Sequence, residues 1–149
     1  MRVRRFIPEQ DWPIVKTWWK DRGAAAPDLI TVHPFGVVCE VEGALTACAF
    51  LYHDKLARTG MVEWECTDPH AGALRTLRAL NHLFAFFEDY AQNNEIVWLF
   101  SWTAEGRGDG RLLRQRQWHA LPGPRHECMC YTAQATKQKP EDVPCLSQP

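Results

Sequence analysis

Two carboxylates and a thiol suited to acid–base or nucleophilic chemistry lie close together in the middle of the chain. Glu63, Glu65 and Cys66 belong to the sequence Met-Val-Glu-Trp-Glu-Cys, which begins at residue 61. Residues two apart in an extended strand point to the same face, so we expect Glu63 and Glu65 to share one. Like-charge repulsion between neighbouring carboxylates favours the neutral form of one of them, which suits a group that takes up a proton. The alternatives are a solvated strand face or an ion pair with Arg58 or Arg75.

A nucleophilic role for Cys66 is a second possibility, but the sequence locates no His or Asn partner that would activate its thiol. The six cysteines are Cys39, Cys48, Cys66, Cys128, Cys130 and Cys145. Three of them lie in predicted strands among apolar neighbours, so we expect reduced thiols that pack as small hydrophobic side chains. The sequence His126-Glu-Cys128-Met-Cys130 has no second ligand pair at the spacing of a zinc site, so we predict no metal.

The elements that must position these residues form one unit between residues 61 and 102. After the first strand comes a helix with an apolar stripe at spacings of three and four, made by Leu74, Leu77, Leu80, Phe84, Phe87 and Ala91. We expect Phe84 and Phe87 to be buried against a sheet. Asn93-Asn94 ends the helix, and the apolar run from Ile96 to Phe100 is typical of a strand that is buried on both faces. Together they predict a right-handed βαβ unit, which binds ligands beyond the carboxyl ends of its strands.

The remaining elements predict one domain from residue 1 to 133. Before the central unit we predict a strand at Arg2–Ile7 and a helix that begins near Trp12, with Asp11 as its cap and Gly23 at its end. A hairpin follows, with strands at Phe35–Val41 and Ala44–Tyr52 and a turn at Glu42-Gly43. After the central unit we predict a loop with Gly106, Gly108 and Gly110, a helix at Arg111–Gln115 that Asp109 caps, and strands at Trp118–Leu121 and Glu127–Thr132. We expect Trp18 and Trp19 to pack against the sheet rather than to form a ligand wall. Residues 134–149 have almost no apolar content, so we predict a disordered tail.

Composition limits the class of function. The chain has 149 residues, of which 46% are hydrophobic and 23% charged, and these values suit one globular domain. A net charge of −1 gives no electrostatic footprint for nucleic acid. No apolar run approaches the roughly 20 residues that span a membrane, and no apolar segment of a secretory signal follows the basic N-terminal residues. We therefore expect a cytoplasmic protein.

The order of the elements resembles that of the GNAT superfamily, the acyl-coenzyme-A-dependent N-acyltransferases, over residues 2 to 133. The segment Val62–Pro69 looks like the family's fourth strand, Gln117-Trp118 stands where the family usually has Gly-Phe, and His126–Tyr131 looks like its last strand. Together with Phe50-Leu-Tyr52, the first segment is also similar to divergent GNAT-like proteins of phages and prophages. The resemblance implies an α/β (α+β) fold, with a mixed sheet of six to seven strands around the βαβ unit and three to four helices on its two faces.

The same resemblance implies a site for acetyl-coenzyme A. The coenzyme would lie between the strands that end at Cys66 and Ser101, and its pyrophosphate would bind amides at the start of the following helix, where unpaired N–H groups and the helix dipole favour an anion. The implied cofactor-binding residues are Cys66, Thr67, His70, Ala71, Gly72, Ala73, Arg75 and Ser101. Glu63 and Glu65 are the candidate catalytic bases.

Two features depart from the family's pattern. The family's phosphate loop is Arg or Gln, two residues, Gly, one residue, then Gly or Ala, whereas this chain has only Pro-His-Ala-Gly-Ala from residue 69. Asp68 and Pro69 suit a cap and first helical residue, so we expect the Asp68 carboxylate to occupy amides that a phosphate needs. Leu112 and Leu113 stand where the family often has a Tyr that protonates the leaving thiolate.

Three functions remain open on the sequence. The first is acetyl transfer from acetyl-coenzyme A to an amine, and the second is a catalytically inactive GNAT-like protein of phage origin with a role in binding or assembly. The third is a different α/β enzyme that uses Glu63, Glu65 and Cys66. The sequence leaves open whether the acceptor is a small molecule or a protein and whether the chain forms an oligomer.

Overall fold

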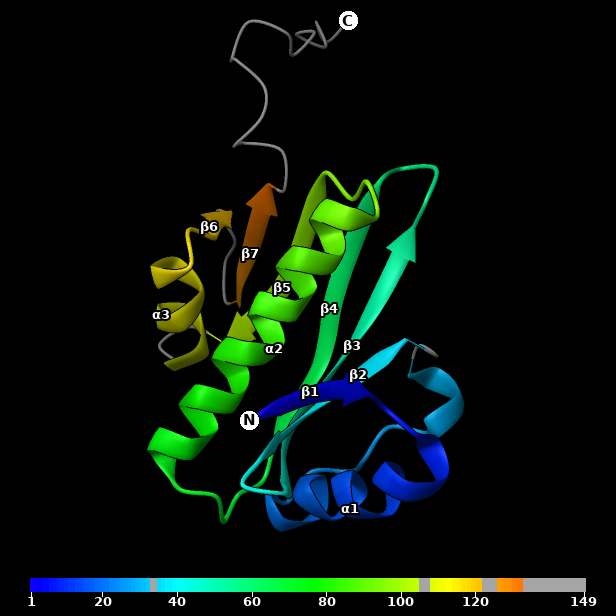
Figure 1. Cartoon of the computed structure of the whole chain (residues 1–149), viewed down its shortest axis with the longest axis vertical. Coiled ribbons are helices and arrows are strands. Elements are labelled where there is room, and N and C mark those ends of the chain that lie inside the picture. Colours follow the sequence, from blue (N-terminus) through cyan, green and yellow to red (C-terminus); the bar gives the residue numbers. More distant parts are fainter. Residues whose placement is uncertain (33–34, 105–107, 122–125, 133–149) are drawn as a thin grey trace, which may run out of the picture.

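The computed structural model describes residues 1–32, 35–104, 108–121 and 126–132 (Figure 1). The strands are β1 (Arg2–Arg5), β2 (Gly36–Val41), β3 (Ala44–Asp54), β4 (Thr59–Thr67), β5 (Trp98–Ala104), β6 (His119–Leu121) and β7 (His126–Thr132), and the helices are α1 (Pro8–Asp21), the short 3-10 helix η1 (Leu29–Thr31), α2 (Ala73–Asn93) and α3 (Gly108–Gln115). The strands form one sheet in the order β1-β2-β3-β4-β5-β7-β6. Adjacent strands of the sheet are antiparallel, except that β4 and β5 are parallel and are connected by α2. The predicted fold class and the central βαβ unit are confirmed.

The helices cover both faces of the sheet (Figure 1). Alternate residues of β2 and β3 face two separate cores, since Val37 packs with the buried residues of α2 and Val38 packs with those of α1. On the α2 side Phe84 and Phe87 are buried as predicted, being 2% and 0% exposed. On the α1 side Trp18 is buried beside Phe6, Val15 and Phe50, which supports its predicted packing role.

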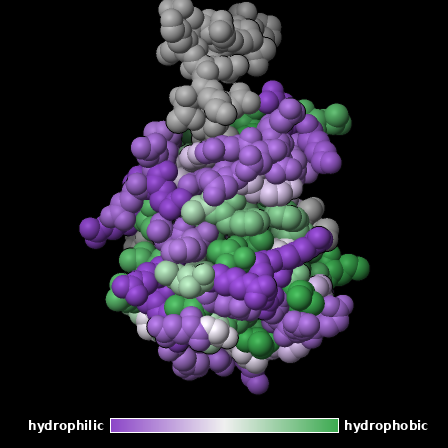
Figure 2. All heavy atoms as spheres, viewed as in Figure 1, coloured by the Kyte–Doolittle hydropathy of each residue, from purple (hydrophilic) through white to green (hydrophobic). Residues whose placement is uncertain are grey.

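The apolar stripe of α2 is buried only from Ala79 onward. Leu74 and Leu77, the first two residues of the predicted stripe, are 62% and 47% exposed. The apolar spacing of three and four residues thus begins almost two turns before the part of α2 that is buried. Hydrophilic and hydrophobic residues are accordingly interleaved on the surface of this face (Figure 2).

Two helix starts differ from the sequence prediction. Helix α1 begins at Pro8, with Ile7 as its N-cap residue, and Asp11 lies buried in its first turn instead of preceding it. The predicted cap is wrong because Pro8 is tolerated at the first helical position, so the helix starts one turn earlier. Helix α3 begins at Gly108 and includes Asp109 and Gly110, which were expected to precede it, whereas Gly106 lies outside the described residues.

Two turns form as predicted. The β2–β3 hairpin turns at Glu42 and Gly43, whose φ angles of 54° and 79° are both positive, as a two-residue hairpin turn requires. Gly23, with φ of 71°, follows the end of α1. The predicted tail, residues 134–149, lies outside the described residues.

Candidate functional site

The strands β4 and β5 part at their carboxyl ends. Their parallel ladder runs from Thr59–Trp98 to Val62–Ser101 and stops there. Beyond that pair β4 stays with β3 as far as Thr67, and β5 stays with β7 as far as Ala104. The edge of β4 that faces β5 therefore has no ladder partner beyond Val62, and a gap opens in the middle of the sheet.

A β-bulge at Trp64 separates the two candidate bases. In the β3–β4 register Glu63 lies opposite Phe50 and Cys66 lies opposite Cys48, so one residue of β3 faces two of β4. Trp64 itself has a positive φ of 57°. The prediction that Glu63 and Glu65 share a face is wrong, because the extra residue reverses the alternation between them.

The two carboxylates consequently have different surroundings. Glu63 lies on the α1 side, since its neighbour Phe50 packs in the α1 core. Glu65 accepts a 2.5 Å hydrogen bond from the Ser101 hydroxyl, across the point where the strands part. Ser101 is fully buried beside Val62, so this bond joins the two strands just beyond the end of their ladder.

An open pocket of about 350 Å³ lies at this gap, lined by Val62, Glu63, Trp64, Glu65 and Trp102. The Trp64 indole is oriented by a 3.0 Å hydrogen bond from its Nε1 to the Tyr52 hydroxyl. The structure thus brings both candidate bases to one pocket from opposite sides of the bulge. The two tryptophans were not predicted as site residues.

The N-terminus of α2 lies one short loop beyond β4. Gly72 is its N-cap residue, with φ of 73°, and no side chain caps the helix within the described part of the chain. The first turn contains no acidic residue. Amides of Ala73, Leu74 and Arg75 therefore stand at a helix start without a carboxylate in front of them, an arrangement that favours an anion.

The expectation that Asp68 caps this helix is wrong. Its carboxylate accepts a 2.9 Å hydrogen bond from the His70 amide, inside the loop and before the helix begins. An Asp side chain readily accepts from the amide two residues ahead, and this local turn holds it away from the helical amides. Among the other predicted residues of the loop, His70 is exposed and Ala71 half-buried.

Arg75 and Thr67 are engaged within the protein. The Arg75 guanidinium donates to the Val41 carbonyl at the end of β2, while its buried Nε has no hydrogen-bond partner among the described residues. Thr67 accepts a 2.7 Å hydrogen bond from Arg22, which also contacts the Cys66 sulfur at 3.4 Å. These contacts fix the end of β4 against α1.

Cys66 is a structural thiol. Burial raises the pKa of Cys66 to about 11, although the nearby Arg22 charge opposes the rise. A thiol that is protonated at neutral pH is a poor nucleophile. This disfavours the enzyme hypothesis in which Cys66 attacks a substrate.

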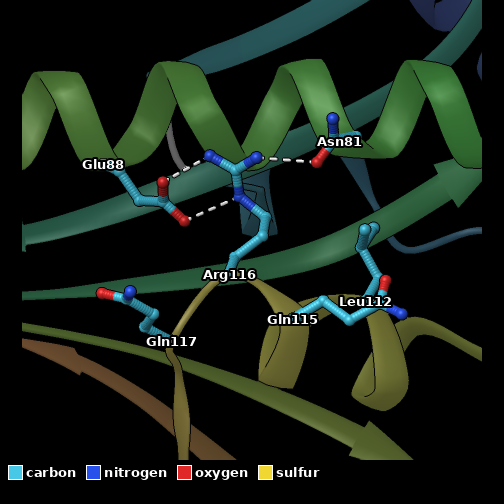
Figure 3. A pocket seen from close by; sticks show the side chains of 6 residues that line it. All are labelled: Asn81, Glu88, Leu112, Gln115, Arg116 and Gln117. Carbon is cyan, nitrogen blue, oxygen red and sulfur yellow. Dashed lines mark hydrogen bonds and ion pairs between the residues drawn. The ribbon is translucent and has the colours of Figure 1, made fainter.

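A second polar cluster joins α2 to the end of α3 (Figure 3). The Arg116 guanidinium donates to both carboxylate oxygens of Glu88 and, at 2.6 Å, to the Asn81 side chain, and Trp118 Nε1 donates to Glu88 at 2.8 Å. Sequence reasoning missed this cluster, because 28 residues separate Arg116 from Glu88 and no local pattern relates them. Beside it lies an open pocket of about 310 Å³.

Several possible features are absent from the part of the chain that the structure describes. It contains no group of three His, Cys, Asp or Glu residues placed to hold a metal ion. None of its helices has the length and apolar content that crossing a membrane requires. Within these residues Cys39, Cys48 and Cys66 are free thiols.

The fold is similar to that of several solved acetyltransferase structures. The ribosomal-protein-alanine N-acetyltransferase from Brucella melitensis is 14% identical, with a TM-score of 0.66 over 89% of this chain and 99% of that one. The spermidine N-acetyltransferase from Vibrio cholerae is 9% identical, with a TM-score of 0.70 over 90% and 96%. The N-acetylglutamate synthase from Neisseria gonorrhoeae, solved with coenzyme A and L-arginine, is 18% identical, with a TM-score of 0.63 over 88% of this chain and 32% of that one.

The chain has the GNAT fold. At these identities the likeness establishes the fold and not the reaction. No known family model matches the sequence, and neither does any curated protein. In this GNAT fold, β4, α2 and β5 form the unit that the sequence predicted, and the gap between the two strands lies at its centre.

Proposed function

We propose that the protein transfers an acetyl or other acyl group from coenzyme A to an amine. The observation that carries this proposal is the parting of β4 and β5 next to a helix start that no side chain caps. A coenzyme A molecule has a long, hydrogen-bonding pantetheine arm and a pyrophosphate. The free edge of β4 from Glu65 to Thr67 suits the arm, and the amides of Ala73 to Arg75 suit the pyrophosphate.

The amine acceptor would approach from the pocket beside Glu63. Its nitrogen would attack the thioester carbonyl, a C–N bond would form, and the C–S bond would break, with the second proton of the nitrogen passing through water to the released thiolate. An ammonium must lose a proton before it can attack, and Glu63 is placed to accept it directly or through water. We assign this role to Glu63 because the Glu65 carboxylate is already held by Ser101.

The second candidate is a GNAT-fold protein that binds a partner without catalysing transfer. It is favoured by α3, where Leu112 and Leu113 are 6% and 0% exposed and carry no proton for a leaving thiolate. The relation to phage-encoded proteins remains a sequence-based proposal.

We also propose a cytoplasmic location. Cys48 and Cys66 lie opposite each other on β3 and β4 and are free thiols, and reducing compartments keep such neighbouring thiols reduced.

Binding of acetyl-coenzyme A tests the proposal. A ligand at a hundred times its dissociation constant stabilises a fold by about 2.7 kcal/mol, which thermal unfolding detects. Ala73→Glu should abolish the shift, because it places a carboxylate at the proposed phosphate position. The same change favours the helix itself, since an acidic residue in the first turn interacts well with the helix dipole. Ala73→Gln, of equal bulk and no charge, should retain most of the shift.

The role of Glu63 is tested separately. Glu63→Gln should retain the thermal shift with acetyl-coenzyme A but slow acetyl transfer, because only the proton acceptor is lost. If millimolar acetyl-coenzyme A gives no shift in the unmodified protein, the transferase proposal is wrong and the non-catalytic candidate replaces it. If Ala73→Glu binds as well as the unmodified protein, the pyrophosphate site lies elsewhere.

A further inference from the structure

The pocket between β4 and β5 is lined by acidic and apolar side chains. Among the residues that the structure describes, the pocket is lined by two acidic residues, Glu63 and Glu65, and by Val62, Trp64 and Trp102. No basic residue of this described part lines it. A ligand that brings a carboxylate or phosphate into this space would meet the two negative charges of Glu63 and Glu65.

The two tryptophans present large apolar surfaces to solvent at this site. Trp64 is 39% exposed and Trp102 is 52% exposed, although Trp is usually well buried in a folded protein. The face of an indole is the strongest aromatic partner for a cation in proteins, and the attraction grows as water is excluded. Exposed tryptophans beside carboxylates therefore favour a cation that also carries apolar groups.

The pocket is organised before any ligand arrives. Trp64 is fixed by its hydrogen bond to Tyr52, and Glu65 is fixed by the bond from Ser101. Arg22, the cation that contacts the end of β4, donates to Cys66 and Thr67 and does not line the pocket. A volume of about 350 Å³ is enough for one small molecule but not for a large one.

We infer that this pocket selects a protonated amine on an apolar aliphatic or aromatic group and disfavours acceptors with a carboxylate or phosphate beside the amine. The inference rests on the proposed function in so far as the bound amine is the acyl acceptor. Under this assignment Trp64 and Trp102 contact the apolar group, Glu63 binds the ammonium, and the charge of Glu65 adds to the attraction for a cation. Free amino acids are poor acceptors because their carboxylate faces Glu63 or Glu65.

Three small probes of similar shape test the inference on the full chain. Phenethylamine is an ammonium on an aromatic group, phenylalanine adds a carboxylate, and 2-phenylethanol replaces the ammonium by a neutral hydroxyl. Isothermal titration calorimetry measures each of them, with and without saturating coenzyme A. Phenethylamine should bind at least about tenfold more tightly than either of the other two, since it alone satisfies both the charge and the indoles.

Matched variants locate the binding. Trp102→Leu and Glu63→Gln should each weaken phenethylamine binding several-fold. Trp98→Leu, at a similarly exposed tryptophan of β5 outside the pocket, and Glu9→Gln, at an exposed acid of α1, should leave it unchanged. Circular dichroism confirms that each variant is folded.

The outcomes separate this inference from the proposed function. A preference for phenethylamine without any thermal shift from acetyl-coenzyme A supports the amine pocket and rejects the transferase. A clear acetyl-coenzyme A shift with equal affinity for phenethylamine and phenylalanine, or with no probe bound in either condition, overturns the inference and leaves the transferase standing. Equal losses in Trp102→Leu and Trp98→Leu also overturn it, because binding would not be in the pocket.

Discussion

Asp11 is a buried carboxylate that ties β1 to the start of α1. It is 1% exposed, accepts 2.7 and 2.8 Å hydrogen bonds from Arg4, and accepts a 2.7 Å bond from the Ile7 amide. Burial alone would raise the pKa of Asp11, but the hydrogen bonds and the charge of Arg4 outweigh it, so the pKa lies below its usual value. Arg4 also donates to Glu40 of β2, which extends the link to a third element.

The first prediction concerns this carboxylate. Asp11→Asn should lower the free energy of unfolding by about 2–3 kcal/mol at pH 7, somewhat less than for a fully buried ion pair because Arg4 is partly exposed. A carboxyl whose folded pKa is depressed stabilises the fold above its unfolded pKa of roughly 3.9, and this contribution is lost as pH falls through the folded pKa. Urea unfolding between pH 7 and pH 2 should therefore show the gap between variant and unmodified protein shrinking below about pH 4.

Glu9→Gln is the matched control, because Glu9 lies exposed in the same helical turn. It should change stability by no more than about 0.5 kcal/mol. A gap between Asp11→Asn and the unmodified protein that stays constant down to pH 2 would show that the Asp11 charge does not stabilise the fold.

Trp64 shows where single residues escape sequence reasoning. Positive φ is found mostly at Gly and Asn and is rare for a residue as large as Trp. The sequence Val-Glu-Trp-Glu-Cys therefore gives no indication of the bulge at Trp64. The period-two pattern placed Glu63 and Glu65 in the right segment, yet one extra residue turns them to different sides. The sequence was enough to place both carboxylates on β4. The face of the sheet on which each one lies depends on how β4 pairs with β3, which the sequence does not show.

At the scale of elements, patterns with strong periods were predictable and long-range polar contacts were not. The α2 helix, the hairpin at Glu42-Gly43 and the parallel β4–β5 pair all follow from local spacing and turn chemistry. The start of α2 was misplaced because Asp68 looks like a cap in sequence but forms a turn of its own with the His70 amide. The cluster around Glu88 joins elements that only the fold brings together.

The cluster of Glu88, Arg116, Asn81 and Trp118 fixes α3 against α2 and leads to a prediction about both helices. Glu88→Ala should destabilise the fold by about 3–5 kcal/mol, because it leaves the Arg116 guanidinium and the Trp118 indole N–H without their acceptor in a mostly buried site. Denaturant unfolding measures the loss. Asp89→Ala, at the next and exposed residue of α2, should cost no more than about 0.5 kcal/mol. Equal effects of the two changes would mean that the cluster contributes nothing to stability.

At the scale of the whole molecule, the sheet has two parts that α2 holds together. One part is β1 to β4 with α1, and the other is β5 to β7 with α3, while α2 contacts β1 to β5 and α3 (Figure 1). Within the described residues, β4 and β5 join the two parts through a short ladder that ends at Val62–Ser101 and through the hydrogen bond from Ser101 to Glu65. The candidate site therefore lies where β4 and β5 separate, beside α2, which packs against both strands.

The last prediction concerns the C-terminal residues of the chain. Among the described residues, the buried hydrophobic residues extend as far as Met129 and Cys130 on β7. Residues 134–149 contain three prolines and two lysines, and Val143 and Leu146 are their only large apolar residues, too little apolar area to offset the entropy of ordering the segment. A chain that ends after Ala133 should therefore unfold within about 2 °C of the full chain by calorimetry, a shift below that of 1 kcal/mol in a domain of this size. A chain that ends after Leu121 lacks β7 and should not fold, which sets the scale of the assay. A fall of 5 °C or more after removal of residues 134–149 alone, roughly 1 kcal/mol or more, would contradict the prediction and show that Val143 or Leu146 packs on the domain.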